Sequence, residues 1–178
     1  MMNPVNVALV TRLPSLSLPQ CHLTAGCLFQ AVWNARAQQK PAAGVKDYDV
    51  FYFDDDLSWE AEDAVIKRVA ALCGDLGVAI EVKNQARVHL WYEQRFGAPY
   101  PQLTSARDGI DRYLVECSCI GIDLATHELY APYGLQDLHD GILRNNSKNP
   151  QPDAFLAKAR SYQARWPWLT IPSAPGTA

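Results

Sequence analysis

The sequence predicts one α/β (α+β) domain in which strands and helices alternate. The chain has 178 residues, of which 48% are hydrophobic and 20% are charged. This length and composition suit a single globular core. Short apolar runs alternate along the chain with segments in which apolar residues recur at helical spacing. We therefore expect one domain over residues 13–170, with residues 1–12 and 171–178 as flexible termini.

The first half of the chain contains two predicted helices with a predicted strand between them. Apolar residues recur at helical spacing within residues 23–36, which predicts a helix that begins near Gly26. Residues 47–53 continue from two aspartates into an apolar run and are predicted to form a strand. Ser58 is expected to cap a second helix, because acidic residues follow it in the first turn and Gly74 lies close after the helix end.

The second half is predicted to contain strands over 78–82 and 115–124, a turn into 129–131, and short helices over 88–96 and 106–113. Asp153 is expected to cap a final helix. This helix should end at Arg165, because Pro167 cannot continue it. The chain shows no internal repeat.

Asp47-Tyr48-Asp49-Val50 is the most informative stretch of the sequence. Side chains alternate faces along a strand, so Asp47 and Asp49 point the same way, about 7 Å apart along the backbone. Two carboxylates held that close repel each other and raise one pKa unless a cation lies between them. Mg²⁺ takes oxygen ligands and needs few protein carboxylates when phosphate supplies the rest. The pair therefore indicates phosphate chemistry.

A third carboxylate, Glu81, lies in the next predicted strand. Since one helix separates the two strands, a neighbouring strand could place Glu81 beside the aspartates. Three carboxylates around one or two Mg²⁺ ions suit phosphoryl or nucleotidyl transfer. Ala25-Gly26-Cys27 adds a second component, because a glycine at a helix N-terminus lets backbone amides approach a phosphate.

Taken in order, these motifs resemble the nucleotidyltransferase superfamily typified by DNA polymerase beta. The chain is also similar to a largely uncharacterised bacterial family of nucleotidyltransferase-like proteins. The superfamily pattern is apolar-Gly-Gly/Ser, then Asp-apolar-Asp/Glu-apolar, then apolar-Asp/Glu-apolar. Here it reads Ala25-Gly26-Cys27, Asp47-Tyr48-Asp49-Val50 and Ile80-Glu81-Val82. Further resemblance lies in residues 28–34, 46–63, 81–92 and 131–135, and it covers about Leu13 to Leu169.

The resemblance implies a small mixed β-sheet flanked by helices, with a bound nucleoside triphosphate and Mg²⁺. It implies Asp47 and Asp49 as catalytic metal ligands. Glu81 would be the third catalytic carboxylate, either binding metal or taking the proton of the acceptor. The leading hypothesis is a Mg²⁺-dependent nucleotidyltransferase that moves a nucleoside monophosphate to an unidentified acceptor. The alternative is a non-catalytic nucleotide-binding or interaction module, and a metal-dependent phosphohydrolase is less favoured.

Nucleotide binding is expected from Gly26, Cys27, Gln30 and Arg87. Cys27 departs from the superfamily pattern, which usually has Gly or Ser there, and a thiol is the poorer hydrogen-bond donor. Arg87 could grip triphosphate oxygens with two hydrogen bonds, although a salt bridge to the acidic residues 60–63 explains it nearly as well. Lys83 has the same two interpretations, whereas for His89 a structural hydrogen bond is favoured over contact with the triphosphate.

The other polar and aromatic residues have plainer structural explanations. Asp47 and Asp49 would otherwise form a solvated strand end, and Glu81 an edge-strand charge. The run Asp54–Asp56 most simply caps a helix. Several aromatic residues are expected to pack at the core or its edge, with stacking on a nucleobase as the alternative: Trp91, Tyr92, Tyr100, Trp166 and Trp168.

Composition limits the partners and the compartment. The net charge of −3 and pI near 5.8 give no strong nucleic-acid signal. Five cysteines without paired C-x-x-C spacing favour a reducing compartment, so a cytoplasmic location is expected. No signal peptide is recognised, and the apolar runs are too short to span a membrane. Acceptor, nucleobase and oligomeric state stay open.

Overall fold

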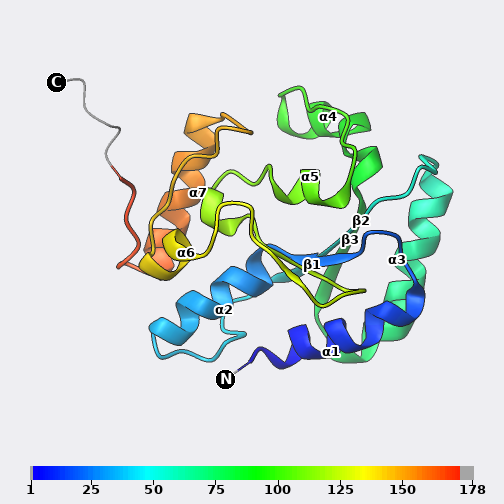
Figure 1. The fold of residues 1–178 in the computed structure, drawn as a ribbon, viewed down its shortest axis with the longest axis horizontal. Coiled ribbons are helices and arrows are strands. Elements are labelled where there is room, and N and C mark those ends of the chain that lie inside the picture. Colours follow the sequence, from blue (N-terminus) through cyan, green and yellow to red (C-terminus); the bar gives the residue numbers. More distant parts are fainter. Residues whose placement is uncertain (1, 173–178) are drawn as a thin grey trace.

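The computed structural model describes residues 2–172, which form a five-stranded sheet with helices on both faces (Figure 1). The strand order is β3-β2-β1-β4-β5. β2 and β3 are parallel, whereas the other neighbouring strands are antiparallel. The mixed sheet expected from the sequence is therefore confirmed. The strands are β1 (His22–Thr24), β2 (Asp47–Tyr52), β3 (Ala79–Asn84), β4 (Gly121–Asp123) and β5 (Leu129–Tyr130).

The helices divide between the two faces of the sheet. They are α1 (Pro4–Arg12), α2 (Gly26–Arg36), α3 (Trp59–Cys73), α4 (Tyr92–Phe96), α5 (Ala106–Ile110), α6 (Gln136–Asp140) and α7 (Pro152–Arg165). Short 3-10 helices lie at Leu13–Leu16, Gly74–Leu76, Gln85–Leu90 and Glu116–Ser118. Figure 1 shows α4, α5 and α7 on one side of the sheet and α1 on the other. In the described residues, no helix is long and apolar enough to cross a membrane.

One face of β2 is apolar and buried, and the opposite face is polar. Tyr48 and Val50 are almost completely buried with Val69 and Cys73 of α3 in one core cluster. Asp47 and Asp49 alternate with these residues and therefore point to the other face. The alternation explains how a strand in the middle of the molecule keeps two carboxylates accessible.

β1 lies directly before the helix that was expected to begin near Gly26. α2 begins at Gly26 as expected, and His22–Thr24 pairs with both β2 and β4. A strand of three residues is too short for its side-chain pattern to mark it in the sequence. The strand expected over 115–124 breaks into a 3-10 turn at Glu116–Ser118 and the short β4.

The N-terminal segment differs from its expectation as a flexible terminus. Residues 4–12 form α1, in which Leu9 is completely buried. Asn3 caps this helix by accepting hydrogen bonds from the amides of Val5 and Asn6. An Asn N-cap followed by Pro4 at the first helical position is a strong start signal for a helix. Most of the expected C-terminal tail, residues 173–178, lies outside the described residues.

Two helix boundaries can be compared directly with the sequence. Ser58 caps α3 as expected, accepting a hydrogen bond from the Ala61 amide at 3.2 Å. α7 ends at Arg165 as expected, but it begins at Pro152, so Asp153 lies in the first turn and does not cap the helix. Pro152 takes the first position because a helix needs no amide donor there.

Aromatic packing fixes α7 against α2. The rings of Phe29 and Trp33 lie 5.4 and 5.3 Å from the ring of Tyr162, and Trp166 lies 5.1 Å from Trp33. Trp166 Nε1 donates to Asn34 Oδ1 at 3.1 Å. These contacts hold the C-terminal helix along α2, with Trp166 at the C-terminal end of α2.

Candidate active site

The parallel register of β2 and β3 brings the three predicted carboxylates to one face. Asp49 is the direct partner of Glu81, and Phe51 is the partner of Lys83. Partner residues on neighbouring strands project to the same side, with strands about 4.8 Å apart. Asp47 lies two residues before Asp49 and shares this face. The structure therefore brings together Asp47, Asp49 and Glu81.

Lys83, two residues after Glu81 on β3, forms an ion pair with Glu81. Its Nζ lies 2.5 Å from a carboxylate oxygen of Glu81. This hydrogen bond, together with the positive charge, lowers the pKa of Glu81. The Glu81 side chain is 44% exposed. Glu81 is therefore an ionised, solvent-accessible carboxylate with its charge already balanced.

Asp49 has the opposite electrostatic environment. Burial is the main cause that raises the pKa of Asp49 to about 7, and the negative charge of Asp47 adds to it. Lys83 and Lys158 act in the other direction but do not cancel the effect. A cation placed between the two aspartates would favour their ionised forms. The pKa of Asp49 therefore lies near neutral pH, and a bound cation would lower it.

The helix that follows β1 presents its N-terminus to this face. Ala25 has a positive φ of 64° and Gly26 begins α2. The Thr24 hydroxyl donates to the Ile120 carbonyl at 2.6 Å and holds the turn in place. The amides of the first helical turn lack acceptors within the helix. A glycine here lets an anion approach this end closely.

Gln30 and Cys27 have different surroundings although both belong to α2. Gln30 lies next to Gly26, because a Cβ added to Gly26 would meet Gln30 Nε2 at 2.6 Å. Its Oε1 accepts a hydrogen bond from Arg165 at 2.8 Å. Cys27 is completely buried, and its thiol donates to the Thr24 carbonyl. Burial raises the pKa of the Cys27 thiol well above its ordinary range. The Cys27 side chain is therefore part of the hydrophobic core.

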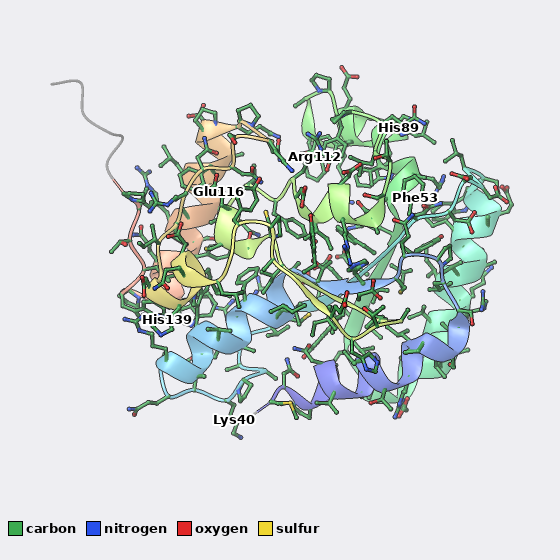
Figure 2. All side chains as sticks on the ribbon, viewed as in Figure 1. Lys40, Phe53, His89, Arg112, Glu116 and His139 are labelled. Atoms are coloured by element: carbon green, nitrogen blue, oxygen red, sulfur yellow. The ribbon has the colours of Figure 1, made fainter. Side chains whose placement is uncertain are left out.

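Arg87 forms its ion pair with an acidic residue of α3 and not with Asp47, Asp49 or Glu81. Its guanidinium forms an ion pair with Glu62, which is 5% exposed. Arg87 Nε also donates to the Leu57 carbonyl at 3.0 Å. The structure therefore gives Arg87 the salt bridge to the acidic residues of α3 that was one of its two interpretations. His89, labelled in Figure 2, has a buried Nδ1 without a hydrogen-bond partner.

Two adjoining chambers lie over the polar face. The first chamber, about 370 Å³, contains Asp47, Asp49 and the N-terminus of α2, whereas Glu81 lines neither chamber. The second chamber, about 290 Å³, is lined mainly by aromatic and amide side chains. The first is lined by Ala25, Gly26, Phe29, Gln30, Asp47, Asp49, Lys83, Phe96, Tyr113, Leu114, Val115, Ser118, Lys158 and Tyr162. The second is lined by Asp49, Phe51, Lys83, Gln85, Val88, Trp91, Tyr92, Phe96, Tyr100, Gly109, Arg112, Tyr113, Leu114, Asn149, Gln151 and Ala154.

The first chamber can bind a polyanion together with a cation. Asp47 and Asp49 supply two oxygen ligands of the type that Mg²⁺ prefers. Lys83, Lys158 and the N-terminus of α2 supply positive charge or amide donors on the same chamber. In the described part of the chain, no group of three or more His, Cys, Asp or Glu residues is arranged to hold a metal ion. The two aspartates are the candidate ligands for a metal whose remaining ligands come from phosphate or water.

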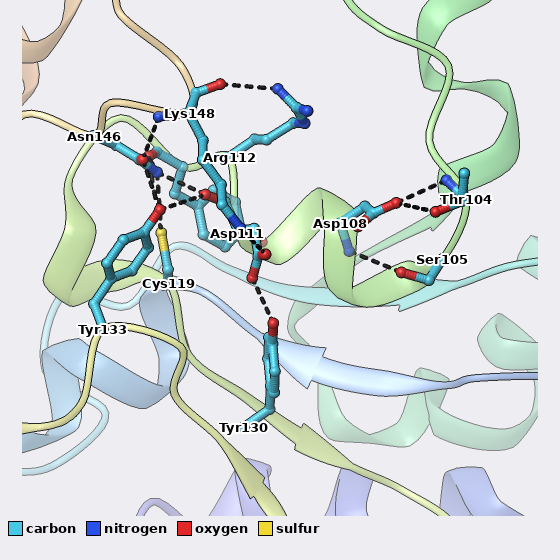
Figure 3. Close-up of polar contacts among 11 residues, drawn as sticks. Thr104, Ser105, Asp108, Asp111, Arg112, Cys119, Tyr130, Tyr133, Asn146 and Lys148 are labelled. Carbon is cyan, nitrogen blue, oxygen red and sulfur yellow. Dashed lines mark hydrogen bonds and ion pairs between the residues drawn. The ribbon is translucent and has the colours of Figure 1, made fainter.

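A buried polar network holds the loop that lines the second chamber (Figure 3). Asn146 is completely buried, and its amide donates to the carbonyls of Asp111 and Tyr113 at 2.7 Å each. The carboxylate of Asp111 accepts from Tyr130 and Lys148 at 2.6 Å each. These bonds tie residues 145–149 to the end of α5, and so position Tyr113 between the two chambers.

Sequence reasoning missed several residues of the chambers. Lys158 and Tyr162 lie one helical turn apart on α7 and both line the first chamber. Their i, i+4 spacing beside the aromatic residues of α7 is the signal that would have placed them together. Tyr113 carries no such signal, because its position depends on the buried network around Asn146.

A larger groove of about 660 Å³ lies between α1 and α2, away from the carboxylates. It is lined mostly by apolar side chains such as Val7, Val10 and Val32. No charged side chain of the described residues lines it. The groove therefore offers no group for acid-base, metal or phosphate chemistry, and the two smaller chambers are the candidate active site.

Comparisons with known proteins identify a family and a similar solved structure. A family model described as nucleotidyltransferase matches residues 11–171. The chain is also similar to a solved NMR structure described as revealing a CCA-adding enzyme head domain. The two are 26% identical, with a TM-score of 0.72, over 97% of this chain and 91% of that chain. Among curated proteins, none matches the sequence.

Proposed function

Because the chain belongs to the nucleotidyltransferase family whose model matches residues 11–171, we propose that it transfers a nucleoside monophosphate from a nucleoside triphosphate to an acceptor with the help of Mg²⁺. One observation carries the finer part of this proposal. Asp47 and Asp49 share a chamber with the N-terminus of α2, and Glu81 is the strand partner of Asp49. Carboxylates and amide donors on one chamber suit a metal-bound triphosphate.

The donor set fits a divalent cation. Asp47 and Asp49 would hold the ion, and a cation bound there would favour the ionised form of Asp49, whose pKa is raised first by burial and then by the charge of Asp47. Glu81 already has Lys83 as its counter-ion, so two protein carboxylates and the phosphate oxygens are the proposed ligand set. When bound, Mg²⁺ would neutralise phosphate charge and stabilise the leaving pyrophosphate.

The side chains of the first chamber have separate roles. Gly26 lets the first-turn amides of α2 reach the terminal phosphates. Gln30 fixes Arg165 beside this turn. The Lys83 ammonium group can exchange its ion pair with Glu81 for one with a phosphate oxygen. Glu81 would then be free to accept the proton of the acceptor. In the transfer, the acceptor atom forms a bond to the α-phosphorus while the bond to the bridging oxygen of pyrophosphate breaks.

The proposal is tested by nucleotide binding and by product analysis. ATP, GTP, CTP and UTP are titrated calorimetrically with and without Mg²⁺, against wild type and the Asp47→Ala, Asp49→Ala double variant. Metal-dependent binding that the double variant loses is expected. The Asp55→Ala variant is the control, since it removes an aspartate from the exposed turn before α3. Binding that ignores both the metal and the double substitution contradicts the proposal.

Product analysis separates transfer from the two other functions considered for this fold. Pyrophosphate release with a nucleotide adduct on the acceptor is the expected result. Release of inorganic phosphate without an adduct would identify a phosphohydrolase. Metal-dependent binding without any product, across a broad set of acceptors, would identify a nucleotide-binding module.

A further inference from the structure

The second chamber is built to hold a flat ring. Trp91, Tyr92, Phe96 and Tyr100 line it with the rings of Tyr92 and Tyr100 stacked at 4.1 Å. Phe96 is 54% exposed, so its ring is accessible at the edge of the chamber. Aromatic side chains favour offset or edge contacts with other rings. The chamber thus provides apolar ring surfaces and an accessible aromatic rim.

The two chambers lie on opposite sides of Asp49. Along β2, the first chamber takes Asp47 and Asp49, whereas the second takes Asp49 and Phe51. The N-terminus of α2 belongs to the first chamber alone. Gln85, Val88 and Trp91, which follow β3, line the second chamber alone, whereas Phe96 and Tyr113 line both chambers. Asp49 therefore marks the junction, and the reacting phosphorus belongs at this junction.

In-line displacement then assigns each chamber a substrate. The attacking atom and the leaving oxygen lie on opposite sides of the phosphorus. If pyrophosphate leaves at the N-terminus of α2, the acceptor enters from the other side of Asp49. We infer that the second chamber binds the acceptor, and that the acceptor is a small molecule whose aromatic ring carries the attacking hydroxyl or amine. This inference rests on the proposed nucleotidyl transfer and names its acceptor class.

The transfer balances without a further reactant. The acceptor oxygen or nitrogen bonds to the α-phosphorus, and the bond from that phosphorus to the bridging oxygen breaks. Pyrophosphate departs with the electron pair of that bond. The acceptor proton passes to Glu81, which is the strand partner of Asp49, and then to water.

Size and charge narrow the acceptor further. A volume of about 290 Å³ suits a single ring with one or two substituents.

The charge of the acceptor is indicated by Arg112. Arg112, labelled in Figure 2, lines the chamber and donates to the Lys148 carbonyl at 2.8 Å. Among the described residues, no carboxylate lies within ion-pair distance of Arg112. An unpaired guanidinium favours a ring with an anionic substituent. The net charge of −3 also gives no support to a polynucleotide acceptor.

The test uses phenol, 4-hydroxybenzoate and tyramine as neutral, anionic and cationic ring probes. Their binding is measured by calorimetry with the full chain, first alone and then with saturating α,β-methylene-ATP and Mg²⁺. A single-stranded oligonucleotide is titrated in parallel. We expect saturable binding with the order 4-hydroxybenzoate, phenol, tyramine, and no displacement by the nucleotide analogue. The oligonucleotide should bind more weakly than 4-hydroxybenzoate.

Variants locate the probe. Tyr100→Leu should weaken all three ring probes by about tenfold. Trp91→Leu should act in the same direction, and because Trp91 is partly exposed and lines the second chamber alone, this variant keeps the test valid if Tyr100→Leu folds poorly. Arg112→Gln should remove the preference for 4-hydroxybenzoate over phenol, about tenfold. The control is Trp59→Leu, which removes a 56% exposed aromatic side chain outside both chambers and should change no binding constant.

Three outcomes overturn the inference. They are failure of every ring probe to bind, probe binding unaffected by the chamber variants, and displacement of the probe by the nucleotide analogue. Displacement would assign the chamber to the nucleobase. A failure of the proposed function is distinguished by the nucleotide titration itself, which does not depend on the probes.

Discussion

Asp49 and Glu81 are direct partners on the parallel strands β2 and β3, yet their environments shift their pKa values in opposite directions. Burial and the neighbouring Asp47 raise the pKa of Asp49 to about 7. The hydrogen bond from Lys83 lowers the pKa of Glu81. Adjacent carboxylates with separated pKa values can take different roles in one reaction. The burial of Asp49 and the hydrogen bond that Lys83 donates to the more exposed Glu81 together create this difference.

Asp49 should make the stability of the metal-free protein fall as the pH rises. The folded chain holds the Asp49 proton more tightly than the unfolded chain, in which the pKa is near 3.8. Its stabilising contribution is fully present below that pKa and is lost as the pH rises to about 7. Asp49→Asn has no such proton, so between about pH 5 and pH 8 it should gain roughly 1–3 kcal/mol relative to wild type.

Urea unfolding of both proteins at the two pH values measures this difference. Asp55→Asn serves as the control, because it changes the charge by the same amount in an exposed turn. Parallel pH dependences of wild type and Asp49→Asn would contradict the raised pKa.

Gly26→Ala should weaken nucleotide binding without unfolding the protein. The new Cβ would lie 2.6 Å from Gln30 Nε2, so the end of the Gln30 side chain must move and loosen its bond to Arg165. The methyl group would also occupy space at the amides of the first helical turn. We expect about tenfold weaker binding of Mg²⁺-ATP by calorimetry, with a change in stability below about 0.5 kcal/mol.

The Gly26→Ala, Gln30→Ala double variant separates the two causes. Binding that recovers to the level of Gln30→Ala alone would mean that displacement of Gln30 is responsible. Binding that stays weak would mean that the phosphate approaches the backbone itself. Unchanged binding in Gly26→Ala would exclude Gly26 from the nucleotide site.

Asn146→Ala should be among the most destabilising single substitutions near the chambers. It leaves the carbonyls of Asp111 and Tyr113 without their donor, and it removes the acceptor of Tyr133 and of the Lys148 amide. Unsatisfied buried groups predict a loss of about 3 kcal/mol in urea unfolding. Tyr133→Phe removes one of these bonds and should cost about 1 kcal/mol. Equal costs for the two variants would contradict the central position of Asn146.

Arg87→Ala should reduce stability and leave nucleotide affinity unchanged. It strands the carboxylate of Glu62, which is 5% exposed and also accepts the Asn84 amide at 2.8 Å. Breaking one side of a buried ion pair predicts a cost of about 3–5 kcal/mol. The Arg87→Gln, Glu62→Gln double variant removes both charges and should cost less. Weaker Mg²⁺-ATP binding by folded Arg87→Gln would instead assign Arg87 to the nucleotide.

The arrangement of the carboxylates could be predicted because it follows from strand geometry. Asp47 and Asp49 share a face in any strand, and a helix between two strands favours their parallel pairing, which placed Glu81 nearby. Ser58 was predictable for a similar reason, since a cap acts within one helical turn. These predictions required only information from residues close in sequence or from a single β-α-β connection.

The remaining features depend on contacts that no local pattern encodes. β1 is only three residues long, which is too short for a sequence pattern to identify it, and its pairing with β2 and β4 depends on the tertiary structure. The partner of Arg87 could have been phosphate or Glu62, and only packing decided between them. The second chamber joins residues from β2, from the segment around α4 and from the loop after Asn146, so its shape is a property of the whole domain.

The turn at Ala25 shows that the conformation of the N-terminal end of α2 depends on residues far away in the sequence. Ala25 adopts φ 64° and ψ −138°, a conformation that costs a residue with a side chain about 1–3 kcal/mol. Its amide and the Thr24 hydroxyl both bond to the Ile120 carbonyl, 96 positions beyond Thr24. A fragment that ended after β3 would keep Gly26, Asp47, Asp49 and Glu81 but would lose this restraint. The minimal catalytic unit must therefore extend through β4, even though every acidic residue assigned to catalysis is encoded in the first half of the chain.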